Sequence, residues 1–518
     1  MFTTTLFPGE GRGPAGEQQR ATLRPVTKTS ATGPRPSPGN SWWTKLAVTA
    51  SALTLAACAA GPDYARPATP SSAAAPFVST SAAVTAASPD DDWWHLYQDP
   101  VLDSLIADAL AANTDIRVAV ARLERARASL REVRNDRTPQ ATLGASATYN
   151  RFSQVQRVPG VDSESWLVDG GLDVSYEVDL FGRISRTIEA ARGDVGAAAA
   201  DADAVRVSVV AETTRAYADA AAAAARLAVA ERIVALLDQS LHVTERRVEV
   251  GMTTPLDALR IAALRDQRRA DVPLLLADRQ AALFRLATLT GRTPQDLPPI
   301  VAQRATMLRL DQPIPVGDGA ALLARRPDVR AAERRLAAAT ARIGVATADL
   351  YPRISLGGSI GQTSTGLGNL FGAGPLNWLL GPLLSWNVNQ GAARARIAGA
   401  EADTQAALAT FDGTVLTALE ETETALSNYK QAIDRRAALA QAREAAERAA
   451  RITRAQRREG QIDSLSQLDA ERTFADAEAA LALADARISR AQVDLFRALG
   501  GGWRPAAVAP SGELPGAS

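Results

Sequence analysis

The sequence predicts a mainly α-helical protein with amphipathic β-strands, built from two tandem copies of one unit of about 200 residues. Three observations predict this fold. Alanine-rich stretches studded with Arg, Glu, Asp and Leu favour long helices, because Ala costs least in a helix interior. Four segments alternate apolar and polar residues with the period of a strand. The chain also matches itself when it is shifted by about 210 residues.

The internal match is the strongest of these observations, because a repeat determines the architecture. Residues 113–146 align without a gap with 326–359, so that Asp115, Arg117 and Pro139 meet Asp328, Arg330 and Pro352. A second match lays Gly251, Leu256 and Leu259 over Gly460, Leu465 and Leu468. Each copy reads as helix, strand, strand, long helix, turn, helix.

The strand segments separate apolar from polar side chains. In 165–180 the even positions are mainly apolar and the odd positions mainly polar, and 376–389 behaves in the same way. Segments 141–150 and 354–361 are weaker versions. A soluble sandwich or a barrel with lipid outside and water inside gives this alternation. Aromatic side chains near the strand ends favour transmembrane strands in a barrel; they are Tyr149, Trp166, Trp378 and Trp386.

The helices are too long for an ordinary globular domain. Residues 184–249 contain no proline and would extend about 100 Å as one helix. The predicted return path consists of 255–289, a Pro-rich loop at 291–316, and 318–350. In the second copy we predict a descending helix at 391–458 and a returning helix at 463–499. A helix at 101–137 is expected to complete the column of this returning helix. Helices of matched length with small-residue faces predict a coiled-coil-like tube wall.

Composition argues against several classes of function. The chain has 57 basic and 57 acidic residues, and the part that follows residue 57 has 51 against 55, so we expect no nucleic-acid binding. Only two histidines occur, His95 and His242, and no P-loop, His-Glu-x-x-His or Gly-x-Ser-x-Gly motif is present. We therefore expect no enzymatic activity, no cofactor and no metal site.

The single cysteine, Cys58, follows a short apolar run. Lys45 precedes residues 46–57, which carry no charge and would rise only about 18 Å as a helix, too short to span a bilayer. A basic flank, a short apolar segment and small residues at its end indicate a secretory signal. We predict an N-terminal extension and signal at 1–57, a tether at 58–92, the two repeats at 93–305 and 306–503, and a tail at 504–518.

Two turns join the long helices. The first contains Gly251, with Thr254 as the expected N-cap, Pro255 as the first helical residue and Asp257 as the capping partner. The second contains Gly460, with Ser464 and Gln467 as a similar capping box. Both glycines suit the left-handed position that ends a helix. Ordinary helical hairpin turns would have the same chemistry.

Several ordered segments resemble a known family. Leu55-Ala-Ala-Cys58 resembles the lipobox of bacterial lipoproteins. Further segments are Cys58-Ala-Ala-Gly-Pro-Asp-Tyr-Ala-Arg-Pro67, Trp93-Trp94, Tyr176-Glu-Val-Asp-Leu-Phe-Gly-Arg183, Arg325-Arg-Pro-Asp-Val-Arg-Ala-Ala-Glu-Arg-Arg-Leu336 and Leu495-Phe-Arg-Ala-Leu-Gly-Gly-Gly-Trp503. Together they resemble the TolC-type outer membrane efflux proteins, in the NodT-like lipoprotein branch, from about residue 58 to 503.

This resemblance implies a homotrimer in which four strands from each protomer close a 12-stranded barrel above a periplasmic helical tunnel. It implies a covalent lipid on Cys58, N-palmitoyl and S-diacylglycerol, and no other cofactor. Ala59, where Asp would retain the protein in the inner membrane, implies the outer membrane. The adaptor-docking tips would be Val250, Gly251 and Met252, with Gly460. Asp257 and Asp469 match the lumen-facing gate aspartates, and Ile462 stands where relatives carry a basic gate partner.

The implied function is a passive exit duct for drugs or other toxic small molecules, working with a periplasmic adaptor (membrane fusion) protein and an inner-membrane transporter of the resistance-nodulation-division (RND) type. Two alternatives stay open. One is a channel for type I protein secretion. The other is a lipid-anchored coiled-coil scaffold without a pore, against which the alternating strand segments argue.

Overall fold

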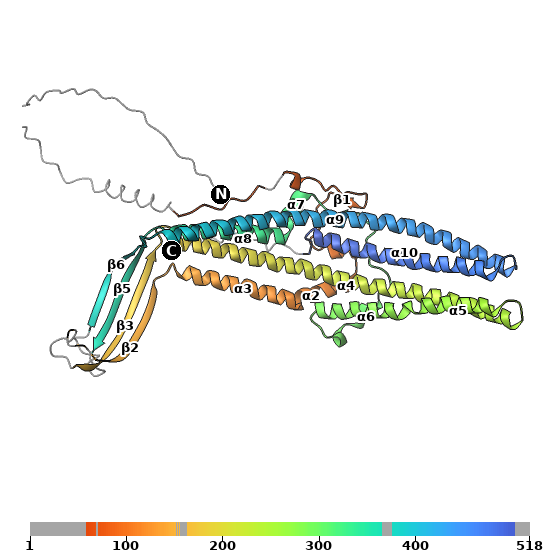
Figure 1. Ribbon diagram of the computed structural model, residues 1–518, viewed down its shortest axis with the longest axis horizontal. Helices are drawn as coiled ribbons and strands as arrows, with labels where there is room; N and C mark the ends of the chain where they lie inside the picture. Colours follow the sequence, from red (N-terminus) through yellow and green to blue (C-terminus); the bar gives the residue numbers. More distant parts are fainter. Residues whose placement is uncertain are drawn as a thin grey trace, which may run out of the picture. The chain divides into compact units, whose positions relative to one another are not determined.

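The predicted order of helix, strand, strand, long helix, turn and helix occurs twice in the structure. The computed structural model describes residues 59–68, 71–151, 153, 155, 163–364 and 376–502, all within the unit Ala56–Ser518. Cys58 and Trp503 therefore lie outside the described residues. Figure 1 shows the strands at one end of the long helices and the two hairpin turns at the other end.

The elements of the two copies correspond one to one. The first copy consists of α3 (Thr114–Asn135), β2 (Gln140–Arg151), β3 (Glu164–Val178), α4 (Arg183–Glu249), α5 (Pro255–Arg269) and α6 (Asp271–Leu289). The second consists of α8 (Pro327–Ala348), β5 (Arg353–Ser364), β6 (Leu376–Ser385), α9 (Gly391–Arg458) and α10 (Ser464–Ala498). Two shorter helices, α2 (Pro100–Ala112) and α7 (Gly319–Arg325), precede α3 and α8. The two strand predictions that continued to residues 180 and 389 were too long.

Three helices that the sequence predicts as continuous are broken, at Asn113, Ala270 and Arg326. The Asn113 side chain accepts hydrogen bonds from the amides of Asp115 and Ile116 and donates one to the carbonyl of Leu289, 2.9 Å away. Arg326 has the extended backbone that a residue before proline prefers, with ψ 123°. Ala270 keeps a helical backbone but caps α6 with no side-chain hydrogen bond.

The four long strands form one antiparallel sheet in the order β2-β3-β5-β6. Its register places Tyr149 opposite Trp166, and Leu172 opposite both Leu143 and Ile360. The apolar positions of the four strands therefore share one face, as the alternation predicts. Strand β6 departs from the prediction at Leu379 and Leu383. These two residues lie opposite Ser359 and Ser355, on the more polar face of the sheet.

The long helices pack side by side in a single layer. Beside the sheet, α4 packs between α3 and α8, and α8 packs against α9. Towards the hairpin turns, α4 packs between α5 with α6 and α10, and α10 packs against α9. The helix α9 is thus at one edge of the layer throughout, with α3, α6 and α5 at the other edge. No described helix combines the length and the apolar character needed to cross a membrane.

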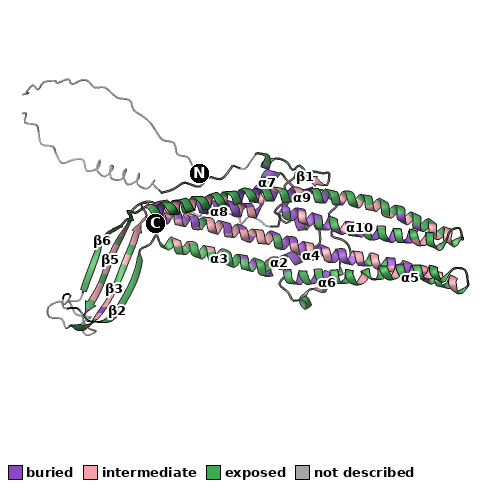
Figure 2. Cartoon of the chain, viewed as in Figure 1, coloured by how far each residue is buried: buried purple, intermediate pink, exposed green. Residues whose placement is uncertain are grey.

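The main core lies midway along the helices, where the segments outside the two copies gather. Trp93, in a short 3-10 helix (Trp93–Tyr97), is fully buried and its ring stacks on Phe496 of α10 at 4.5 Å. Two strands that we did not predict, β1 (Val84–Thr85) and β4 (Ile314–Pro315), pair in parallel beside it. Three more 3-10 helices occur at Ser71–Ala74, Pro294–Asp296 and Pro299–Gln303. Figure 2 shows buried residues concentrated along α4 and mainly exposed residues on α3 and the outer strands.

Candidate functional site

The two hairpin turns have the same backbone geometry. Gly251 and Gly460 have φ values of 74° and 73°, which confirms the predicted left-handed glycines. After each glycine, the next amide donates to a carbonyl five residues earlier, Met252 to Arg247 at 2.8 Å and Gln461 to Gln456 at 2.9 Å. These are the hydrogen bonds of a Schellman-type helix end.

Both turns present their side chains to solvent. Val250 and Met252 are 68% and 74% exposed. Leu256 and Leu465, which the repeat makes equivalent, are also exposed. A Cβ atom added to Gly251 or Gly460 would meet no atom within 4 Å. The turns are therefore accessible apolar surfaces, and their role in docking stays a prediction.

The starts of the two return helices differ. Thr254 is the N-cap of α5 and Pro255 is its first residue, as predicted, but the Thr254 hydroxyl does not accept a capping bond. The hydroxyls of Thr253 and Thr254 instead donate to Asp257 Oδ2, at 2.6 and 3.3 Å. Asp257 thus lies in the first turn of α5, and Asp469 is exposed in the second turn of α10. A gate role for these carboxylates stays a prediction.

The predicted cap at Ser464 is wrong. The N-cap of α10 is Asp463, whose carboxylate accepts from the Ser466 amide at 2.8 Å, because an Asp one residue earlier offers the helix a strong cap. Hydrogen bonds from Ser466 lower the pKa of Asp463. A lowered pKa means that the cap stabilises the start of α10 at neutral pH. This contribution is lost as the pH falls below about 4.

We expect Gly251→Ala or Gly460→Ala to loosen its turn, because a left-handed backbone costs a residue with a Cβ about 1–2 kcal/mol. Amide hydrogen exchange at residues 247–256 or 456–465 should become roughly tenfold faster. Gly413→Ala is a matched control, since Gly413 is an open, right-handed position inside α9. That substitution should leave exchange unchanged or slower. Equal effects of all three substitutions would contradict the left-handed requirement.

The sheet carries aromatic side chains at both of its ends. Far from the helices, Tyr149 and Trp166 pack at 5.6 Å, and Trp378 is the third residue of β6. Beside the helices, Phe181 stacks on Tyr351 at 4.6 Å, and the Trp386 indole donates to the Leu350 carbonyl. The predicted positions near strand ends are confirmed. The Phe181–Tyr351 pair was missed, although Phe181 directly follows the strand predicted at 165–180 and Tyr351 lies three residues before the strand predicted at 354–361.

The start of the N-terminal segment is bound at the helix end of the sheet. The Ala60 amide donates to the Phe181 carbonyl at 3.0 Å, and Ala59 lies against Gly182. The buried Arg186 side chain binds the Ala60 carbonyl and the Asp63 carboxylate, at 3.2 and 2.6 Å. The predicted tether is therefore held against α4 from its first described residues onward.

Further along, carboxylates of the long helices hold the same segment. Glu333 of α8 accepts from the Tyr64 hydroxyl at 3.4 Å and forms an ion pair with Arg66. Glu423 of α9 accepts from the consecutive amides of Val78 and Ser79, at 2.7 and 2.9 Å. The segment thus crosses from the sheet towards the central core over α8 and α9.

A family model described as "Outer membrane efflux protein" matches residues 105–292 and 320–501. These two ranges contain the two copies of strands and long helices, and together they cover more than half of the chain. The chain belongs to the outer membrane efflux protein family. The family predicted from the sequence motifs is confirmed.

Individual relatives agree with this assignment. Outer membrane protein OprJ of Pseudomonas aeruginosa is 35% identical over 460 residues, which cover 87% of this chain and 94% of OprJ. The solved outer-membrane channel OprN is similar with a TM-score of 0.81 and 40% identity, over 86% of this chain and all of that chain. The open MtrE channel of Neisseria gonorrhoeae gives 0.74 and 30%, over 86% and 98%. This efflux protein is an outer-membrane channel component whose long helices form a periplasmic tunnel.

Proposed function

We propose that three copies of this efflux protein form the exit duct of a tripartite RND-type efflux system, joined to the inner-membrane transporter by a periplasmic adaptor. The observation that carries the proposal is that the sheet and the helix layer are open at matching edges. Strand β2 leads into the layer edge through α3, and β6 leads into the opposite edge through α9.

The open edges require partners in a membrane. The outer edges of β2 and β6 have no neighbouring strand among the described residues, and unpaired backbone groups are costly in lipid. A contact between β2 of one copy and β6 of the next satisfies both edges and repeats around a ring. Three copies of a four-stranded sheet close a barrel of twelve strands, within the range of transmembrane barrels. The same contact brings α9 beside α3, α5 and α6 of the neighbour.

The lipid anchor fits the same arrangement. Ala59 lies against Gly182, next to the Phe181–Tyr351 aromatic pair at the helix end of the sheet. Aromatic side chains concentrate at the membrane interface, so a lipid on Cys58 would start at the periplasmic surface of the outer membrane. The lipid would be an auxiliary anchor, because the barrel itself is held by its apolar face.

We expect Cys58→Ser to impair processing and to reduce the yield of trimers, while the trimers that do form still export. Trimer yield from outer-membrane fractions and drug accumulation in a deletion strain measure the two effects. The substitution Ser51→Ala, earlier in the same apolar run, is a control that should leave both unchanged. Complete loss of barrel insertion in Cys58→Ser would show that the lipid anchor, and not the barrel, is the main attachment to the membrane.

The exposed tips provide the docking surface for the adaptor. Val250, Gly251 and Met252 form one tip and Gly460 lies at the centre of the other, and each copy presents both. Relatives of the chain are named for the export of antibiotics, toluene, pyoverdine and cations. This range supports a duct that leaves the choice of cargo to the inner-membrane partner.

Planar-bilayer recording of purified protein tests the proposal. Trimers should give a stable ionic conductance, and a lipid-anchored scaffold without a pore should give none. Pull-down of the periplasmic adaptor together with an RND transporter supports the efflux duct. If an ATP-driven type I secretion transporter is pulled down instead, the protein is still a channel, but it serves protein secretion and not RND-type efflux.

A further inference from the structure

A groove crosses the helix layer at mid-height. It has a volume of about 570 Å³ and is lined by side chains from α4, α6, α9 and α10. Its floor consists of small apolar residues that are buried or half-buried: Ala222, Ala223, Ala282, Ala425, Ala486 and Ala491. Around the floor stand ionisable side chains: Asp219, Arg226, Asp278, Arg487, Arg490 and Asp494. The groove is thus apolar at its base and charged at its rim.

The groove faces away from the segments that cover the layer. On α4, Tyr217 points to that cover, because its hydroxyl donates to Asp99 at 3.0 Å and Arg304 lies over its ring. Asp219 and Arg226 follow Tyr217 by two and nine residues, which places them about 160–180° away around the helix. The uncovered face of a channel wall is its lumen. This assignment to the lumen rests on the function proposed above.

Positive charge exceeds negative charge once the side chains next to the groove are included. Two carboxylates are neutralised by ion pairs, Asp219 with Arg490 at 2.6 Å and Asp494 with Arg215. Arg226, Arg487 and the neighbouring Arg497 have no carboxylate partner among the described residues, and Asp278 has no basic partner there. The groove lining itself holds three guanidiniums and three carboxylates. The excess comes from the residues beside it: Arg215 and Arg497 add two guanidiniums, while the nearby Glu212 is neutralised by Arg285.

The guanidiniums are also crowded. Arg487, Arg490, Asp494 and Arg497 succeed one another at intervals of three or four residues and so share one face of α10. The pKa of Arg215 is lowered first by burial and then by the nearby charge of Arg497. The guanidiniums of Arg226 and Arg487, which have no carboxylate partner among the described residues, can each bind a carboxylate or sulfonate through two parallel hydrogen bonds.

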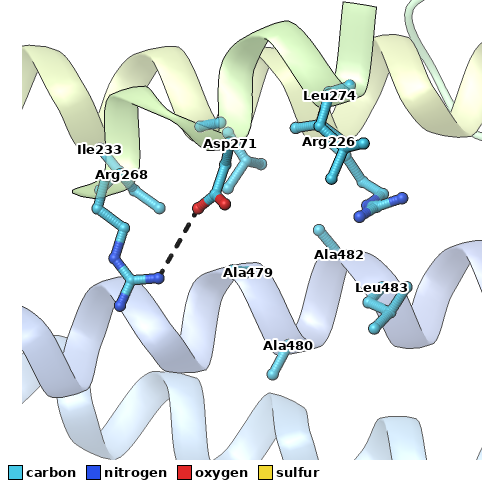
Figure 3. A pocket seen from close by; sticks show the side chains of 12 residues that line it. Arg226, Ile233, Arg268, Asp271, Leu274, Ala479, Ala480, Ala482 and Leu483 are labelled. Atoms are coloured by element: carbon cyan, nitrogen blue, oxygen red, sulfur yellow. Dashed lines mark ion pairs between the residues drawn. The ribbon is translucent and has the colours of Figure 1, made fainter. Parts of the chain in front are cut away.

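The groove continues towards the tips into a second cavity of about 270 Å³, and Arg226 and Leu483 line both. Figure 3 shows Arg226 extending from α4 between Leu274 of α6 and Leu483 of α10. The rest of this second cavity is mainly aliphatic, with the Arg268–Asp271 ion pair at its far end. Arg226 is thus a cation set between two apolar surfaces.

We propose that this lumenal groove is a binding site for amphiphilic organic anions. The apolar body of such a solute would cover the alanine floor, and its carboxylate or sulfonate would pair with Arg226 and Arg487. A solute that binds here narrows the duct and reduces the ionic current. The site gives the channel wall an affinity for one chemical class, while the choice of exported cargo stays with the inner-membrane partner.

Block of single-channel current by cholate, applied below its micellar concentration, tests the proposal. Cholate should block the native channel, and tetrabutylammonium, an apolar cation, should block it much less. The double substitution Arg226→Gln/Arg487→Gln should raise the half-blocking concentration of cholate at least about tenfold. Asp278→Asn removes the opposing carboxylate and should lower that concentration. Arg66→Gln, a control in the covering segment, should leave it unchanged.

Each outcome has a distinct meaning. Equal block by cholate and tetrabutylammonium, or cholate block that survives the double substitution, would overturn the anion site. The open-channel conductance of each variant shows that it is folded and assembled. A native protein without any conductance would contradict the channel proposed above and not the groove alone.

Discussion

Trp93→Ala is expected to destabilise the protein by about 3–5 kcal/mol, the usual cost of removing a large aromatic side chain from a core. Trp93 is fully buried and stacks on Phe496 with ring planes 10° apart. A Cβ atom on Gly501 would come within 2.7 Å of its ring, so the indole also packs against the end of the described chain. The ring therefore joins the N-terminal segment to α10.

Thermal or urea unfolding of the detergent-solubilised protein, followed by helical circular dichroism, measures this loss. Trp93→Phe is the matched control. It keeps an aromatic ring for the stack and removes a buried indole N–H that has no hydrogen-bond partner. Its cost should be roughly 1 kcal/mol, well below that of alanine. Similar losses for alanine and phenylalanine would show that the stack contributes little.

The second large effect is expected from Arg326→Met, which should cost about 3 kcal/mol. The buried guanidinium donates to Asp328 at 3.0 and 2.6 Å and to Glu421 at 2.7 Å. It also donates to the Ala498 carbonyl at the end of α10, 2.9 Å away. Methionine can fill the volume but removes all four of these hydrogen bonds, although the Val329 amide still donates to Asp328 and the Thr422 hydroxyl to the Ala498 carbonyl.

The unfolding midpoint measures this change as well. Arg335→Met is its control, because Arg335 pairs with Asp201 on the surface, where both side chains are about half exposed. That surface pair should be worth no more than about 1 kcal/mol. If the two substitutions cost the same, the buried network at the junction of α8, α9 and α10 does not contribute as the geometry indicates.

The repeated pattern made most of the fold predictable. The helix predicted at 391–458 agrees with α9, and the alternation in 165–180 and 376–389 located β3 and β6. The helix breaks could have been found from local signals. Arg326 precedes a proline, and Asn113 has the residue type of an N-cap. These short signals were outweighed by the helix-favouring composition on both sides, because each break occupies a single residue.

The sites were predictable where a backbone conformation demands a residue type. Gly251 and Gly460 stand out because a left-handed turn favours glycine. The contacts of the N-terminal segment could not be predicted in the same way. Arg186 and Glu423 bind backbone carbonyls and amides, which every sequence offers equally. The groove on α4 was also missed, since it requires faces of four helices to meet.

The four-stranded sheet has almost no interior of its own. Strand β2 is exposed along nearly its whole length and β6 likewise, and in Figure 2 no described helix packs on either face of the sheet. A lone chain can bury the core around Trp93, but no described element covers its strands. The open edges of β2 and β6 could then pair with strands of unrelated chains. In the trimer proposed above, assembly therefore completes folding. We expect the stability of the strands to depend on subunit concentration, whereas the helices around the core should retain a stability of their own.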